Sequence, residues 1–142
     1  TGYGITYTGV EGLTVSYATN DVNGGSAAAD GDTDAIALAY VMGSITAKYS
    51  NNDYDVGAAA QDQDTEAYSL SYTVSDSLSV TYGIETISEG TLIDADYSKI
   101  STSYTTGGVT ISASMAEGEN IAGTTAANED LEYWSLGASF AF

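Results

Sequence analysis

The stretch LSYTVSDSLSVTY, residues 70–82, decides the fold. On both sides of Asp76, aliphatic and aromatic residues alternate with Ser and Thr, which is the pattern of two antiparallel strands joined by a tight turn. Because successive side chains of a strand point to opposite faces, each strand has one apolar face and one hydroxyl-rich face. The stretch therefore predicts a β-hairpin that is apolar on one side and polar on the other.

The same hairpin plan occurs three more times along the chain. The related segments are ITYTGVEGLTVSY (5–17), LAYVMGSITAKY (38–49) and TSYTTGGVTIS (102–112). A tyrosine precedes each turn, at Tyr7, Tyr40, Tyr72 and Tyr104, with spacings of 33, 32 and 32 residues. A regular repeat of hairpins predicts an all-β protein with an antiparallel, up-and-down sheet.

Short and long connections alternate between the predicted strands. The nine expected strands are 3–10, 13–21, 34–42, 44–52, 65–75, 78–88, 97–106, 109–117 and 131–142. Tight turns join them on one rim, and long acidic loops, about 22–33, 53–64, 89–96 and 118–130, join them on the other. Glu11 and Asp76 are the only acids on the short-turn rim. This arrangement is typical of transmembrane β-barrels, with the long loops extracellular and an aromatic girdle, here Tyr7, Tyr40, Tyr72, Tyr104 and Phe142.

Composition excludes several classes of function. The 142 residues include 20 acids and only 2 basic residues, for a net charge of −18, which argues against binding to nucleic acid phosphates. The absence of cysteine and histidine removes disulfides, thiolate metal sites and most zinc and triad chemistry, and no catalytic constellation is recognisable, so we do not expect an enzyme. No stretch approaches 18 consecutive apolar residues, although barrel strands need apolar residues only at alternate positions.

An odd number of strands predicts that the barrel is incomplete. Bacterial single-chain barrels have an even number, with both chain ends on the short-turn rim, whereas here the first strand would begin on the long-loop rim. Nine strands alone would also close a barrel so narrow that its own side chains must fill it. A wall of Ser, Thr, Gly and Ala leaves space instead, so we expect this chain to be one part of a wider, water-filled barrel.

These features resemble the C-terminal half of a Gram-negative general diffusion porin, closest in style to the alphaproteobacterial porins. The resemblance covers residues 1–142 as one part of a single barrel domain, and it rests on the hairpins and on the last segment, LEYWSLGASFAF (131–142). It implies a barrel of roughly 16 strands, a homotrimer, passive diffusion of ions and small hydrophilic solutes, and location in the outer membrane among lipid and lipopolysaccharide. It also implies that Phe142 and Phe140 form the signal read by the barrel-insertion machinery. The constriction of such pores lies in the half that this chain lacks.

Candidate pore-lining residues lie opposite the apolar alternation. They are Lys48, Lys99, Glu85, Ser69, Ser71, Thr81, Ser101 and Ser103. The two lysines would tune anion passage, or else pair with lumenal carboxylates such as Glu85 or simply belong to a solvated wall. Because carboxylates repel anions within a Debye length of about 8 Å, the large negative charge predicts a mild cation preference.

Two other features have competing interpretations. Asp30, Asp32 and Asp34 form an all-oxygen set that could hold Ca²⁺ in a loop, which would be the only cofactor. The set lacks the EF-hand spacing and its closing Glu, so a solvated, self-repelling loop is the favoured interpretation. Trp134 would sit at the lipid headgroups or at a subunit contact.

Two functions compete with a porin. The first is a non-transporting outer-membrane barrel that displays acidic loops, as an adhesin or an autotransporter-type anchor. The second is a soluble β-sandwich or surface-layer module, in which the apolar faces would pack against each other across a dry interior.

Overall fold

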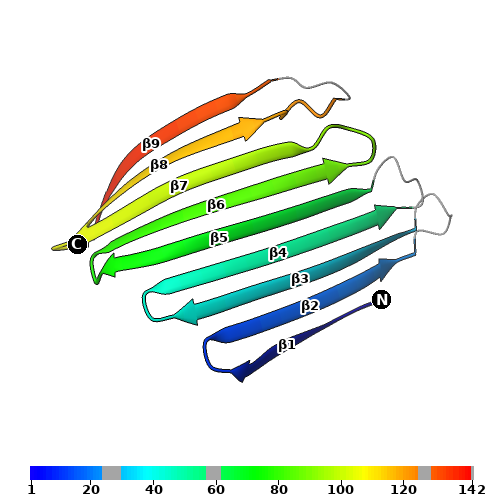
Figure 1. Ribbon diagram of the computed structural model, residues 1–142, viewed down its shortest axis with the longest axis horizontal. Helices are drawn as coiled ribbons and strands as arrows, with labels where there is room; N and C mark the ends of the chain where they lie inside the picture. The colour runs from blue at the N-terminus through cyan, green and yellow to red at the C-terminus, as the bar shows by residue number, and fades with distance from the viewer. Residues whose placement is uncertain (24–29, 57–61, 125–128, 142) are drawn as a thin grey trace.

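The computed structural model describes residues 1–23, 30–56, 62–124 and 129–141, and these form one curved antiparallel sheet (Figure 1). The nine strands pair in sequence order from β1 to β9, so every neighbour in the sheet is also a neighbour in the chain. They are β1 (Gly2–Val10), β2 (Leu13–Val22), β3 (Gly31–Met42), β4 (Ile45–Val56), β5 (Gln63–Ser75), β6 (Leu78–Glu89), β7 (Ala95–Thr106), β8 (Val109–Glu119) and β9 (Leu131–Phe140). The predicted up-and-down antiparallel topology is confirmed.

Strands are longer at the loop side than the sequence predicts. β3, β4, β5, β7 and β8 each extend two to four residues into segments that the sequence analysis assigns to loops. Asp32 and Asp34 therefore belong to β3, and Asp53 and Asp55 to β4. Aspartate has a low strand propensity, but a neighbouring strand that already offers its backbone N–H and C=O groups overrides that preference.

The described loop segments bind to one another through their backbones. The N–H of Gly90 donates to the carbonyl of Asp62 at 2.9 Å, and the N–H of Ile93 donates to the carbonyl of Thr124 at 2.9 Å. These bonds join the β6–β7 connection to the described residues on both sides of it. The described part of the chain contains no helix long and apolar enough to cross a membrane.

Two β-bulges interrupt the register next to short turns. On β1, Tyr7 pairs with Val15, but Val10 pairs with Leu13, so the register shifts by one residue between them. A similar shift lies on β5 between Thr73 and Ser75. The bulge on β1 places Val10 opposite Leu13, so apolar residues face each other next to that turn, whereas the bulge on β5 places Ser75 opposite Leu78.

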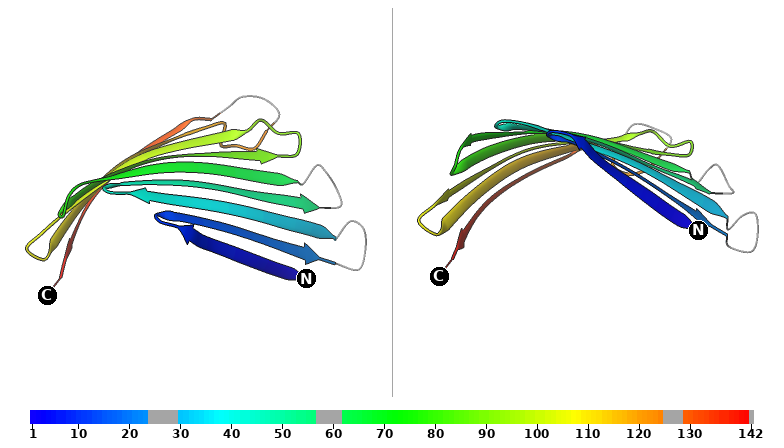
Figure 2. Two further views of the ribbon diagram at one scale, coloured as in Figure 1. Left: turned by 60° about the horizontal axis from the view of Figure 1, so that its bottom comes forward. Right: turned by 90° about the horizontal axis from the view of Figure 1, so that it is seen from below.

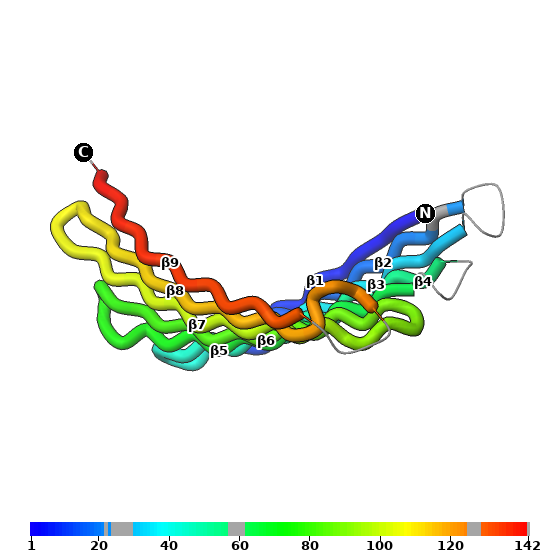
Figure 3. The backbone as a smooth tube through the Cα atoms, turned by 90° about the horizontal axis from the view of Figure 1, so that it is seen from above, coloured from blue at the N-terminus to red at the C-terminus, as the bar shows by residue number. Residues whose placement is uncertain are grey.

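The sheet is a single layer bent into a trough, with its middle strands at the bottom and both edges raised (Figures 2 and 3). No hydrophobic side chain of the described residues is buried, so the sheet has no core of its own. Large apolar side chains are instead exposed, by 53% at Leu70, 62% at Phe140 and 76% at Trp134. The stabilisation that folded proteins normally draw from buried apolar area must therefore come from whatever covers this face.

The polar face is the concave one. For an L-residue, the direction of the strand and of its N–H fixes the side to which the side chain points. In β3, the N–H of Val41 donates to the carbonyl of Gly12, which lies in the turn between β1 and β2. Given the direction of β3 in Figure 1 and the curvature in Figure 3, this bond requires the side chain of Val41 to point to the inside of the trough. Lys48 lies on the same face, since Val41 pairs with Thr46 and Ala39 with Lys48. Tyr40 and its alternate neighbours consequently point to the convex side.

Candidate functional site: the concave wall and the acidic rim

The concave wall is made mainly of small side chains, with Ser and Thr the most frequent and Ala and Gly among them. All eight residues that the sequence predicts to line a pore lie on this face: Lys48, Lys99, Glu85, Ser69, Ser71, Thr81, Ser101 and Ser103. Strands β6 to β9 form a hollow of about 440 Å³ on this face, which is lined mainly by Ser and Thr with Lys99 at its margin.

Hydroxyl groups on adjacent strands bind each other across this wall. Four directly opposed pairs lie within hydrogen-bond distance: Ser71 and Thr81 at 2.9 Å, Ser114 and Ser135 at 2.8 Å, Thr105 and Thr110 at 2.9 Å, and Thr6 and Ser16 at 3.1 Å. A hydroxyl has one donor and two acceptor positions, so each paired group can still bind water. The wall is therefore suited to contact with water.

The strands contribute only four charged side chains to the concave wall. Lys48 and Lys99 are positive, and Glu85 and Glu89 are negative, so the charges of the described strands balance on this face. Neither lysine forms an ion pair with any described residue. The predicted alternative, in which the lysines are neutralised by lumenal carboxylates, has no support in the described part of the chain.

The convex face carries two rows of aromatic side chains. Tyr7, Tyr40, Tyr72 and Tyr104 all point to this side near the short turns, and each is more than 40% exposed. A second row nearer the loops contains Tyr17, Tyr49, Tyr68, Tyr82 and Trp134. Phe142, the fifth predicted girdle residue and one half of the predicted assembly signal, lies outside the described residues, while Phe140 is described and exposed. Trp134 pairs with Met115 in the second row.

Most of the strand acids lie on the convex face, and the sequence analysis missed this. The group continues the apolar alternation past the second aromatic row toward the loops, and its members are Asp21, Asp32, Asp34, Asp53, Asp55, Asp64, Glu66, Asp96, Glu117, Glu119 and Glu132. We call this set the acidic rim. The sequence does contain a signal for this set. Asp32 and Asp34 stand at the same alternate positions as Ile36, Leu38 and Tyr40, so all five share one face of the strand.

The acidic rim places like charges directly opposite each other on neighbouring strands. Asp34 pairs with Asp53, and Asp53 pairs with Asp64, so three carboxylates stand in one cross-strand row. Directly opposed like charges are destabilising. The rim therefore lowers the stability of the strand ends and is not a device that holds them together.

Tyrosine hydroxyls of the second aromatic row donate to carboxylates of the acidic rim. Tyr49 and Tyr68 both donate to Oε1 of Glu66, at 3.0 and 2.8 Å, and their rings lie 4.9 Å apart. Tyr17 donates to Oδ1 of Asp34 at 2.6 Å. Each ring thus has an apolar body among aliphatic neighbours and a polar tip among charges. This is the arrangement expected where an apolar layer meets a wet one.

The predicted calcium set does not form a loop. Asp32 and Asp34 lie in β3 and Asp30 directly precedes it. Side chains on one face of a strand are about 7 Å apart, which is too far for three neighbours on one strand to hold the same ion. Among the described residues, no group of three or more acids is arranged to hold a metal ion. Calcium binding stays a prediction that rests on the sequence.

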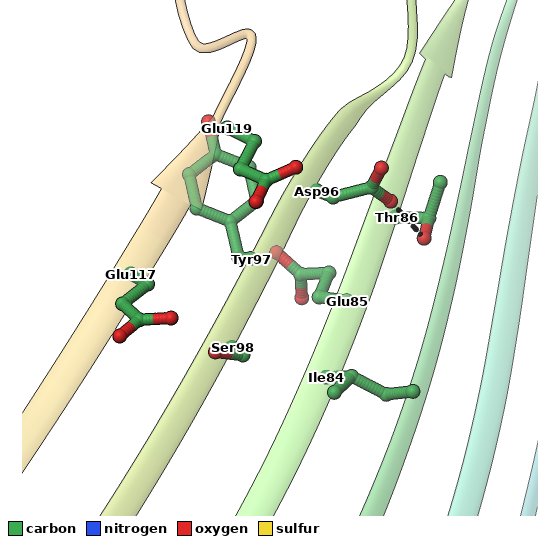
Figure 4. A pocket seen from close by; sticks show the side chains of 8 residues that line it. All are labelled: Ile84, Glu85, Thr86, Asp96, Tyr97, Ser98, Glu117 and Glu119. Carbon is green, nitrogen blue, oxygen red and sulfur yellow. Dashed lines mark hydrogen bonds between the residues drawn. The ribbon is translucent and has the colours of Figure 1, made fainter. Parts of the chain in front are cut away.

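A shallow hollow of about 230 Å³ lies where β6, β7 and β8 approach the loops (Figure 4). Its lining residues include Glu85 of the concave face and Asp96, Glu117 and Glu119 of the acidic rim. The hydroxyl of Thr86 donates to Asp96 at 2.6 Å. No basic side chain of the described residues lines this hollow.

The fold is that of known outer-membrane proteins. A porin whose structure was refined at 1.8 Å resolution superposes with a TM-score of 0.73 over 96% of this chain and 50% of its own length, at 18% sequence identity. OmpT, an outer membrane protein of Vibrio cholerae, superposes with a TM-score of 0.58 over 96% of this chain and 53% of its own, at 17% identity.

At these identities the likeness concerns the fold alone. No known family model matches the sequence, and no curated protein matches it. The chain spans about half the length of each structure that it resembles. The nine strands thus have the curved, antiparallel architecture of a porin-like outer-membrane barrel.

Proposed function

We propose that this chain is the C-terminal part, residues 1–142, of an outer-membrane porin that lets ions and small hydrophilic solutes diffuse passively through a water-filled pore. One observation carries the proposal: the apolar face is convex and exposed, while the hydroxyl face is concave. In the sandwich alternative the apolar face would have to be turned inward against a second layer. A convex apolar face suits contact with lipid around the outside of a barrel.

The directions of the two edge strands support a barrel that is completed by an odd number of further strands. β1 and β9 both run from the loop rim to the turn rim, so they would be parallel if the nine strands closed on themselves. An odd number of further strands makes every seam antiparallel, and seven would give the roughly 16 strands of a porin. The nine strands would then form one part of a single barrel domain.

The surroundings follow from the same proposal. The barrel would lie in the outer membrane of a Gram-negative bacterium, of alphaproteobacterial type, as a homotrimer with its acidic loops extracellular. Tyr7, Tyr40, Tyr72 and Tyr104 would mark the periplasmic side of the lipid. The acidic rim would reach the level of the lipopolysaccharide headgroups. Phe140 and Phe142 would serve the insertion machinery.

The proposed cation preference has to originate at the mouth of the pore. The described strands contribute two positive and two negative side chains to the concave wall, which gives no net bias. The negative charge lies in the acidic rim and in the connections. Charges at a pore mouth raise the local concentration of cations within about a Debye length, about 8 Å at physiological salt. We therefore propose a mild preference, set outside the strand wall.

Recording the full-length protein in a planar lipid bilayer tests the pore. We expect stable conductance steps in groups of three. Replacing Ser71 on the concave wall with tryptophan should lower the step size because the ring occupies lumenal space, while Tyr72→Trp, one residue along and on the other face, should leave it unchanged.

Folded wild-type protein without conductance would contradict the pore and favour the non-transporting anchor. Equal effects of the Ser71 and Tyr72 variants would contradict the assignment of faces.

A further inference from the structure

The two basic side chains of this chain stand in one row of the concave wall. Cross-strand pairing joins Lys48 to Ser69, Ser69 to Gly83, and Gly83 to Lys99. The row therefore crosses β4, β5, β6 and β7 with a lysine at each end. The sequence alone does not reveal this alignment, because the bulge in β5 helps to set the register between β5 and β6.

Nothing bulky stands between the two lysines. Ser69 is small and Gly83 has no side chain, and a methyl group built on Gly83 would have only the Tyr68 carbonyl at 3.4 Å and the Ser69 Cβ at 3.6 Å as its nearest neighbours. Three strand spacings separate the lysine backbones by about 14 Å. Both ammonium groups thus extend over an open stretch of wall.

Neither lysine has a salt bridge to a described residue, although Glu85 and Lys99 line the same hollow. Glu85 is the nearer of the two concave acids in register, because it pairs with Tyr97 in the next row toward the loops. Glu89 lies four residues beyond Glu85, at the end of β6. The other strand acids belong to the acidic rim on the opposite face. In this strongly acidic chain, the two positive charges therefore lie together on the concave face, while most of the negative strand charges lie on the convex face.

We propose that Lys48 and Lys99 form an anion-contact band in the lumen, selective for small solutes that carry carboxylate or phosphate groups. The inference rests on the proposed pore and adds the class of solute that its wall retains. A lysine ammonium is a compact charge on a flexible stem, so it can follow a passing anion, and the surrounding Ser and Thr hydroxyls can donate hydrogen bonds to it. The local preference of the band is opposite in sign to the net charge of the chain.

The two lysines would meet a passing anion in succession. Barrel strands are tilted by 35–45°, so a row across four strands climbs along the pore axis by about 9 Å. The lysine backbones are about 14 Å apart, which exceeds a Debye length of about 8 Å, so the fields of the two charges overlap only in part. Each lysine should therefore act as a separate contact point, and their effects should multiply.

The test is the reversal potential of the full-length protein in a bilayer under a KCl gradient. Lys48→Gln and Lys99→Gln should each raise the ratio of potassium to chloride permeability about twofold, and the double variant about fourfold. Lys48→Arg and Lys99→Arg keep the charge and should keep the wild-type ratio. Glu85→Gln removes a charge of the other sign from the same wall and should lower the ratio.

Glu66→Gln is the matched control, because it removes one charge from the convex face of the neighbouring strand β5. Because the acidic rim favours cations, this variant should lower the ratio slightly or leave it unchanged, whereas both lysine variants should raise it. Conductance with a ratio that does not change in the double glutamine variant would overturn the anion band and leave the pore intact. Absence of conductance from folded wild-type protein would overturn the pore and the band together.

Discussion

Replacing Leu70 with arginine is expected to destabilise the folded barrel by about 2–4 kcal/mol. Leu70 lies on the convex face of β5, between Tyr68 and Tyr72, and is 53% exposed. On our account lipid covers this position, and a guanidinium group there has neither water nor a partner with which to bind. Equilibrium unfolding of the full-length protein in lipid bilayers measures the change.

Ser71→Arg is the control for this substitution. It places the same side chain one residue further along β5, on the concave wall, where water solvates it. We expect a change within about 0.5 kcal/mol, as for an ordinary surface substitution. Similar losses at positions 70 and 71 would show that arginine is poorly tolerated in β5 for a reason unrelated to lipid.

Gly12→Ala is expected to cost more than about 2 kcal/mol, because the turn imposes two separate penalties. Gly12 has a φ of 76°, in the left-handed region that residues with a side chain disfavour. A Cβ at this position would also lie 2.3 Å from the carbonyl oxygen of Val41. That strand cannot move away easily, since the N–H of Val41 donates to the carbonyl of Gly12 at 2.8 Å.

Gly43→Ala separates the two penalties. Gly43 also has a positive φ, of 57°, but nothing lies within 4 Å of a Cβ built there. Its alanine variant should lose only the conformational term, about 1–2 kcal/mol. Unfolding midpoints of the two variants give the comparison, and an equal loss at both turns would contradict the close contact between the first turn and β3.

The sequence predicted the sheet well because its signal is redundant. Each strand repeats the alternation of apolar and hydroxyl residues several times, and the tyrosines before the four turns fix the order of the hairpins. The loop-side ends were less predictable. Asp53 and Asp55 look like loop residues by propensity, and they extend β4 only because β3 and β5 lie beside them to pair with.

For the candidate site, too, the sequence predicted what depends on alternation within a strand and not what depends on neighbouring strands. The face of each candidate residue could be derived from parity alone, and the structure places all eight on the concave wall. The row that joins Lys48 to Lys99 could not be derived from the sequence, because it depends on the register across three strand pairs. One of these pairs contains a bulge. The convex position of the acidic rim was not predicted because some of its members, such as Asp53 and Asp55, were assigned to loops, in which alternation has no meaning. The others, such as Glu66 and Glu117, lie at the strand ends beside those loops.

The central claim is that lipid covers the convex face and water covers the concave one. The chain contains no cysteine, so single cysteines at positions 69, 70, 71 and 72 of β5 can be labelled without interference from this part of the protein. In bilayers, we predict that a water-soluble thiol reagent modifies the variants at Ser69 and Ser71 and spares those at Leu70 and Tyr72. Equal modification of all four variants, or modification of positions 70 and 72 alone, would contradict the claim that lipid covers the convex face.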